Sequence, residues 1–162
     1  MNTKVRIGVL VSGSGTNLQA IIDAVKSGYI QQSEIVVVIS SKADAFALER
    51  GYRAGIESFF VDPKNYATAD DYSRCLAECL TDRRVDLVCL AGFMRKIEKP
   101  FLDAFKGRIM NIHPALLPKF GGKGMYGHLV HEAVIKAGEK ESGPTVHFVD
   151  EQYDHGPIIL AF

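Results

Sequence analysis

Short apolar runs alternate with stretches of helical periodicity along this chain, and that alternation leaves few possible folds. Residues 5–11 read V-R-I-G-V-L-V, a nearly continuous apolar run of the kind found in strands that are covered on both faces. After a glycine-rich turn, apolar residues recur at helical spacing over residues 17–26. Because strands joined by helical crossovers lie parallel, repeats of this unit predict an α/β protein with a doubly wound, mostly parallel sheet.

The same strand–helix alternation continues to the end of the chain. Further strands are predicted at residues 35–40, 58–61, 85–90, 108–113, 145–149 and 157–162. Further helices are predicted at residues 43–54, 69–80, 100–105 and 128–137. Residues 118–127 contain four glycines and are predicted to form a mobile loop. Ligands of such sheets bind outside the carboxyl ends of the strands, which places candidate binding segments at residues 12–17, 91–97 and 111–113.

The length and the net charge of the chain limit the kinds of ligand that the protein is expected to bind. A chain of 162 residues falls in the size range of one domain. Its nineteen basic and nineteen acidic residues cancel, which argues against binding to nucleic acid. No apolar run approaches the roughly 20 residues of a membrane span, and the N-terminus lacks the apolar core of a signal peptide. We therefore expect a cytoplasmic protein that acts on small molecules, with its three cysteines as free thiols.

The turn after the first strand has the composition of an anion site. Residues 12–17 read S-G-S-G-T-N and lead into a helix, for which Thr16 or Asn17 is the predicted N-cap. Backbone N–H groups and the helix dipole at such a turn favour a phosphate. The segment lacks the G-K-[ST] of a Walker A motif, and Leu18 stands where a dinucleotide fingerprint has its third glycine. A purely structural turn remains the alternative.

Asn111 and His113 form the strongest candidate for a catalytic pair. Side chains two apart on a strand share a face, and Pro114 biases His113 toward an extended backbone. An amide donor beside a titratable imidazole is suited to a carbonyl that becomes a tetrahedral oxyanion. The pair therefore predicts acyl transfer.

A catalytic histidine also needs a partner that holds its tautomer, ideally a carboxylate. Asp150, Glu151 and Asp154 follow the strand at 145–149, from where a loop could reach back to His113. The alternative is that these carboxylates are solvated and only cap turns. His147, in the middle of that strand, is interpreted as a hydrogen-bonded core histidine.

Other chemistries are less well supported by the sequence. His128 and His131 have a helical spacing that permits metal binding, but the chain contains neither HExxH nor CxxC, so no metal site is predicted. The absence of a GxSxG elbow argues against a serine hydrolase.

Several of these segments together resemble a known family, the phosphoribosylglycinamide formyltransferases of purine synthesis. The resemblance is carried, in the family's order, by residues 9–20 (V-L-V-S-G-S-G-T-N-L-Q-A), 40–50, 91–95 (A-G-F-M-R), 111–118 (N-I-H-P-A-L-L-P) and 150–159. It implies a Rossmann-like sheet of the formyltransferase type. It also implies transfer of a formyl group from 10-formyltetrahydrofolate, as co-substrate and without a metal, to the amine of glycinamide ribonucleotide.

The resemblance assigns roles by position. Asn111, His113 and Asp154 would be the catalytic residues, with Asp154 raising the pKa of His113. The ribonucleotide phosphate would bind at Gly15, Thr16 and Asn17. The folate would contact Met94, Arg95, Lys96, Ile97, Asn111, Asp150, Glu151, Gln152, Tyr153 and Asp154.

The family likeness carries further expectations. The bond between Leu117 and Pro118 is expected to be cis. Residues 1–162 are expected to form a single formyltransferase domain that lacks the family's C-terminal strand and helix, and to be a monomer or a weak homodimer.

Three alternatives remain. A formyltetrahydrofolate deformylase shares the Asn, His and Asp site, but usually has a regulatory domain before it, and here the first strand begins at residue 5. A methionyl-tRNA formyltransferase would have a basic loop, which the zero net charge argues against. A non-catalytic nucleotide-binding module would bind ligand without turnover.

Overall fold

A computed structural model describes residues 3–162. The strands are β1 (Val5–Val11), β2 (Ser33–Ser40), β3 (Glu57–Phe60), β4 (Leu87–Leu90), β5 (Ile109–His113), β6 (Thr145–Phe148) and β7 (Ile158–Ala161). The helices are α1 (Thr16–Lys26), α2 (Phe46–Arg53), α3 (Ala69–Asp82), α4 (Lys99–Ala104) and α5 (His128–Lys136), with a 3-10 turn η1 (Pro63–Asn65).

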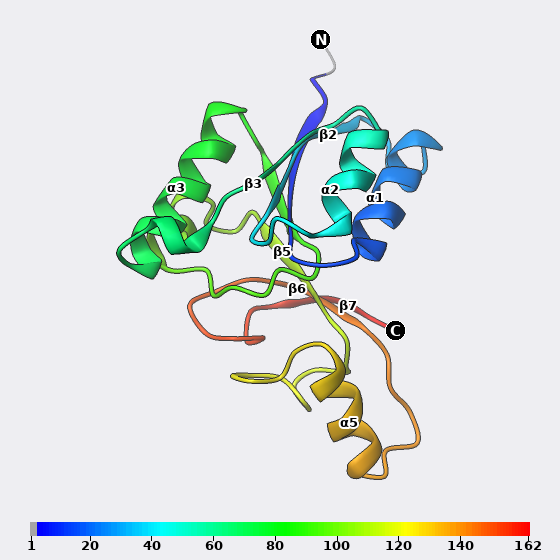
Figure 1. The fold of residues 1–162 in the computed structure, drawn as a ribbon. Coiled ribbons are helices and arrows are strands. Elements are labelled where there is room, and N and C mark those ends of the chain that lie inside the picture. The colour runs from blue at the N-terminus through cyan, green and yellow to red at the C-terminus, as the bar shows by residue number, and fades with distance from the viewer. Residues whose placement is uncertain (1–2) are drawn as a thin grey trace.

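The seven strands of the described residues form one sheet, in the order β3-β2-β1-β4-β5-β6-β7. The pairs from β3 to β5 are parallel, whereas β5–β6 and β6–β7 are antiparallel. Figure 1 shows α1 and α2 on one face of the sheet and α3 on the other. The predicted doubly wound, mostly parallel α/β sheet is thus confirmed. The change of direction at β6 brings the C-terminal part of the chain back beside β5.

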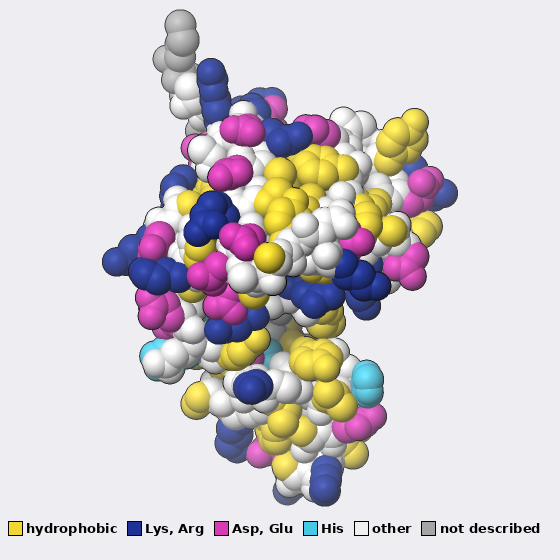
Figure 2. Space-filling model, turned by 60° about the vertical axis from the view of Figure 1, so that its left-hand side comes forward, with side chains coloured by type: hydrophobic (Ala, Val, Ile, Leu, Met, Phe, Trp, Pro, Cys, Tyr) yellow, Lys and Arg dark blue, Asp and Glu magenta, His cyan; other side chains and the backbone are white. Residues whose placement is uncertain are grey.

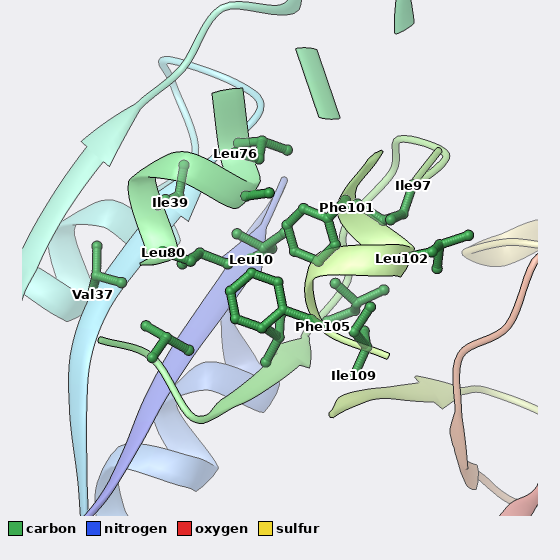
Figure 3. Packing of buried hydrophobic residues seen from close by; sticks show 14 of the residues in the cluster. Leu10, Val37, Ile39, Leu76, Leu80, Ile97, Phe101, Leu102, Phe105 and Ile109 are labelled. Atoms are coloured by element: carbon green, nitrogen blue, oxygen red, sulfur yellow. The ribbon is translucent and has the colours of Figure 1, made fainter. Parts of the chain in front are cut away.

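The two faces of β1 build the two halves of the core. Ile7, Val9 and Val11 point to one face, where they pack with α1 and α2. Leu10 points to the other face and joins a larger cluster from α3 and α4, which includes Phe101 (Figure 3). Fully burying one such aliphatic or aromatic side chain contributes roughly 1.5–3 kcal/mol. The nearly continuous apolar run of β1 is therefore explained by its position in the middle of a sheet covered on both faces.

The predicted elements are present, with shifted ends at the second helix. That helix was expected from residue 43, but α2 begins at Phe46. The Ser40 side chain folds back to hydrogen-bond both the N–H and the C=O of Lys42, and Ala45 has an extended backbone. These contacts replace the first helical turn with a bend. Serine competes with helical backbone pairing in this way at turns.

A smaller lobe between β5 and β6 carries α5. Its own apolar cluster centres on Ala115, Val130 and Val134. The bond between Leu117 and Pro118 is cis, as the family likeness predicted. Figure 2 shows the surface narrowing between this lobe and the main body. Within residues 3–162, no helix has the length and apolar character needed to cross a membrane.

Candidate active site

The carboxyl ends of β1, β2 and β4 are joined by side-chain hydrogen bonds. Ser12 and Ser41, both buried, are hydrogen-bonded through their hydroxyl groups. The Met94 N–H donates to Ser12 Oγ at 2.9 Å. In the parallel pairing of β4 with β5, Leu90 is the partner of Asn111. The three segments predicted to carry binding residues therefore meet at one edge of the sheet.

The turn at residues 12–17 is held in shape by α2. Gly15 is the N-cap of α1 in a left-handed conformation with φ 77°, and no side chain caps the helix. The prediction that Thr16 or Asn17 is the N-cap was therefore wrong. A Cβ at Gly15 would lie 2.6 Å from Ala47 Cβ, so only glycine fits where α2 packs against the turn. The Arg50 Nε–H donates to Ser14 O at 2.8 Å, which fixes the turn further.

A cavity of about 510 Å³ lies between this sheet edge and the smaller lobe. Its volume is within the usual range for small-molecule sites. Asn17, Asn111 and His113 line it, whereas Gly15 and Thr16 lie just before Asn17 on the adjoining turn. The cavity wall also contains the other residues predicted to contact a folate, namely Met94, Arg95, Lys96, Ile97, Asp150, Glu151, Gln152, Tyr153 and Asp154.

The pairing of β5 with β6 determines which side chains meet in the cavity. Asn111 stands opposite His147, and His113 stands opposite Thr145. Residues opposite each other in an antiparallel pair share a face, as do residues two apart on one strand. All four side chains therefore lie on one face. Thr145 is fully buried, and its hydroxyl donates to Ala115 O in the smaller lobe. The side chains of Asn111, His113 and His147 line the cavity.

Both ring nitrogens of His113 face oxygen acceptors. Nδ1 lies 3.4 Å from Asp154 Oδ1, and Nε2 lies 2.7 Å from the Phe120 carbonyl oxygen. The Phe120 carbonyl only accepts, so Nε2 carries the hydrogen of that bond, whereas the Asp154 carboxylate faces Nδ1 at a longer distance. The side chain is 3% exposed, which keeps water from competing for these contacts. The buried His113 ring therefore faces the Asp154 carboxylate on one side and a backbone carbonyl of the glycine-rich loop on the other.

Asp154 connects the two histidines with the glycine-rich loop. Its Oδ1 contacts His113 and lies 3.6 Å from His147 Nε2, while its Oδ2 accepts the Gly122 N–H at 3.0 Å. Burial alone would raise the pKa of this carboxyl, but the two histidines and the Gly122 N–H outweigh it and leave the pKa below its ordinary value. Asp154 is therefore an anion at neutral pH.

His147 is the residue whose place in the site the sequence did not predict. It is 2% exposed and hydrogen-bonded, as expected of a core histidine, but its Nε2 also lies 3.1 Å from Asn111 Nδ2. Burial lowers its pKa, whereas Asp154, the Phe148 carbonyl and the charge of Asp150 together raise the pKa above the ordinary value. In the sequence, Thr145 and His147 stand two apart on a predicted strand, which indicates that they share a face. This spacing does not show that β6 pairs with β5, and only that pairing places His147 opposite Asn111.

The remaining candidate groups lie outside this arrangement. Cys75, Cys79 and Cys89 are free thiols. Burial raises the pKa of Cys79 and of Cys89 to about 11, so both stay protonated at neutral pH. Among residues 3–162, no cluster of three or more His, Cys, Asp or Glu side chains could hold a metal ion.

The fold and the site together define an α/β enzyme of the group-transfer class, with a histidine, a carboxylate and an amide in one small-molecule cavity. The formyl transferase family matches residues 5–161. The chain is 44% identical over 155 residues to phosphoribosylglycinamide formyltransferase of Haemophilus influenzae, covering 96% of this chain and 70% of the relative. Glycinamide ribonucleotide transformylase 1 of Symbiobacterium toebii superposes with a TM-score of 0.93 at 48% identity, covering 100% of this chain and 74% of that one. The chain therefore belongs to the phosphoribosylglycinamide formyltransferases, within the formyl transferase family.

Longer relatives contain the same region as one part of a larger chain. The trifunctional purine biosynthetic protein adenosine-3 of Drosophila melanogaster is 47% identical over 156 residues, which are 96% of this chain and 11% of that protein. The chain thus spans about a tenth of the length of such trifunctional relatives.

Proposed function

We propose that this protein transfers a formyl group from 10-formyltetrahydrofolate to the amine of glycinamide ribonucleotide, in purine biosynthesis. The observation that carries the proposal is the buried contact between His113 and Asp154, which lies in the same cavity as Asn111. The similarity to single-function phosphoribosylglycinamide formyltransferases supports the choice of substrates.

The proposed reaction needs no nucleophile from the protein. The substrate amine attacks the formyl carbon and forms the new C–N bond, and the formyl oxygen gains negative charge. The tetrahedral intermediate then breaks its bond to the folate nitrogen, which leaves with a proton as the amine loses one. The His113 imidazolium and the Asn111 amide stabilise the oxyanion, and Asp154 keeps the imidazolium charged by its opposite charge.

The glycine-rich loop must change its contacts during this cycle. Nδ1 of His113 is directed to Asp154 and Nε2 to the Phe120 carbonyl, so neither ring nitrogen is free for a substrate oxygen. Binding of the formyl donor would displace the Phe120 carbonyl and release Nε2–H. Positive φ angles at Phe120, Gly122 and Gly124 are consistent with a loop whose backbone can rearrange.

The binding roles follow from the positions of the segments. The turn with Gly15, Thr16 and Asn17 would hold the ribonucleotide phosphate through backbone N–H groups. The apolar wall around Ile97 and the segment at 150–154 would hold the folate. The protein would act in the cytoplasm on small molecules only, as a monomer or a weak homodimer.

An assay with a 10-formyl folate analogue tests this proposal, run with and without glycinamide ribonucleotide. Release of the deformylated folate only in the presence of the ribonucleotide supports the transferase. Equal release without it would instead identify a deformylase, in which water replaces the amine. Binding of both compounds without any release would identify a non-catalytic module.

A further inference from the structure

His147 sits between the amide and the carboxylate of the site. Its Nε2 lies 3.1 Å from Asn111 Nδ2 and 3.6 Å from Asp154 Oδ1. The other ring nitrogen, Nδ1, lies 2.9 Å from the Phe148 carbonyl oxygen. The contact with Asn111 is within hydrogen-bond distance, and that with Asp154 is longer than a hydrogen bond.

These contacts determine the protonation state of the ring. A carbonyl oxygen only accepts, so Nδ1 must carry the hydrogen and donate it to Phe148. Asn111 Nδ2 only donates, so Nε2 must accept and carry no hydrogen. With both hydrogen bonds made, His147 is the neutral ring with its hydrogen on Nδ1. Burial lowers the pKa of His147, but Asp154 raises the pKa and so favours the charged ring, in which Nε2 cannot accept from Asn111. A proton at His113 favours the neutral ring, because a second cation beside the same Asp154 oxygen would be repelled.

The contact also determines how the Asn111 amide is oriented. An asparagine amide can turn about its last bond and exchange its oxygen and nitrogen, unless a partner distinguishes the two. The lone pair on His147 Nε2 accepts only from the amide nitrogen. The Nδ2 group has a second hydrogen, which stays available to a ligand in the cavity that Asn111 lines.

We propose that His147 is a positioning residue, which acts through Asn111 by holding the amide nitrogen toward the reacting formyl oxygen. This role rests on the proposed formyl transfer and adds a specific requirement to it. Without the acceptor at His147 Nε2, the Asn111 amide turns over in a fraction of the molecules. In that fraction its oxygen, instead of its nitrogen, faces the developing oxyanion. The rate of transfer then falls, whereas the binding of the substrates changes little.

The test is a set of four variants with steady-state kinetics at saturating concentrations of both substrates. In His147→Gln, the side-chain oxygen reaches the region of Nε2 and can accept from Asn111. In His147→Leu, the acceptor is lost at similar volume. The other two are Asn111→Ala and the double variant Asn111→Ala with His147→Leu. Far-UV circular dichroism and unfolding by urea check that each variant is folded.

We expect kcat of His147→Leu to fall by about 10²-fold, the lower end of the loss seen when an oxyanion donor is removed, with both KM values within about threefold. His147→Gln should keep most of the wild-type kcat. The double variant should be no slower than Asn111→Ala alone, because residues that act as a unit are not additive.

The outcomes separate this inference from the proposed function. If the wild type shows no transfer, the proposed function fails and the role of His147 fails with it. If the wild type is active but His147→Leu keeps its kcat, or the two single losses multiply in the double variant, only the role of His147 is overturned. Should His147→Leu not fold, His147→Asn replaces it, because its shorter amide can reach Phe148 but not Asn111.

Discussion

Asp154 Oδ1 lies 3.4 Å from His113 Nδ1, although the two residues are far apart in the sequence: His113 ends β5, and Asp154 follows β6. The Asp154 backbone has φ 51°, a left-handed conformation that is uncommon outside glycine. The carboxylate also holds the glycine-rich loop through the Gly122 N–H. One side chain therefore links His113 to the glycine-rich loop.

Replacing Asp154 by Asn should slow the reaction strongly and leave the fold intact. Asn has nearly the same shape, but it lacks the negative charge that we propose stabilises the imidazolium form of His113 during the reaction. We expect kcat to fall by about 10²–10³-fold, the range for losing one oxyanion donor. Steady-state assays at saturating substrates measure this loss. A rate near that of the wild type would refute the role assigned to Asp154.

The same variant should change how stability depends on pH. The folded-state pKa of Asp154 is lowered, so its charge stabilises the fold above the unfolded pKa of about 3.9 and this contribution is lost as pH falls through the lower, folded value. Urea unfolding between pH 6 and acid should therefore show a steeper loss of stability below about pH 4 in the wild type than in Asp154→Asn. Parallel curves would contradict the lowered pKa.

Gly15→Ala should weaken binding of the ribonucleotide. The new methyl group would lie 2.7 Å from the Ala47 Cα, and a left-handed backbone costs a non-glycine residue roughly 1–2 kcal/mol. Because 1.4 kcal/mol is tenfold in affinity, we expect the KM for the ribonucleotide to rise by about tenfold. Gly13→Ala is the matched control, since nothing lies within 4 Å of a Cβ there. Equal KM values for the two variants would argue against a phosphate site at this turn.

Thr145→Val should destabilise the protein. The Thr145 hydroxyl donates to Ala115 O at 2.7 Å and accepts the Leu117 N–H at 3.1 Å, so it ties β6 to the start of the smaller lobe. Valine has the same shape but leaves the buried Ala115 carbonyl and the partly buried Leu117 N–H without this partner, at about 1–3 kcal/mol for a buried group. Urea unfolding measures the loss, with Thr145→Ser as a control that retains the hydroxyl.

The sequence predicted the α/β architecture and the meeting of three segments at one sheet edge, because both follow from periodicity and from the geometry of parallel strands. The shared face of Asn111 and His113 followed from the two-residue repeat of a strand. The role of Asp154 could not be derived in this way, since several loop carboxylates were equivalent by spacing. It came from the family likeness.

Other features of the site could not be predicted, because they depend on tertiary contacts that produce no recognisable pattern in the sequence. The place of His147 in the site requires the antiparallel pairing of β5 with β6, which no residue spacing encodes. The contact between His113 and Phe120 involves a backbone carbonyl, so the side chain at residue 120 carries no signal for it. The glycine N-cap of α1 depends on how closely α2 packs against the turn.

The most direct test of the mechanism is the rate of formyl transfer in His113→Ala, measured at saturating concentrations of both substrates. With the imidazolium gone, the oxyanion keeps only the Asn111 amide, and kcat should fall by about 10²–10³-fold in a protein that still unfolds cooperatively. The KM values should change much less than kcat. A folded His113→Ala protein that transfers formyl at close to the wild-type rate would contradict the account.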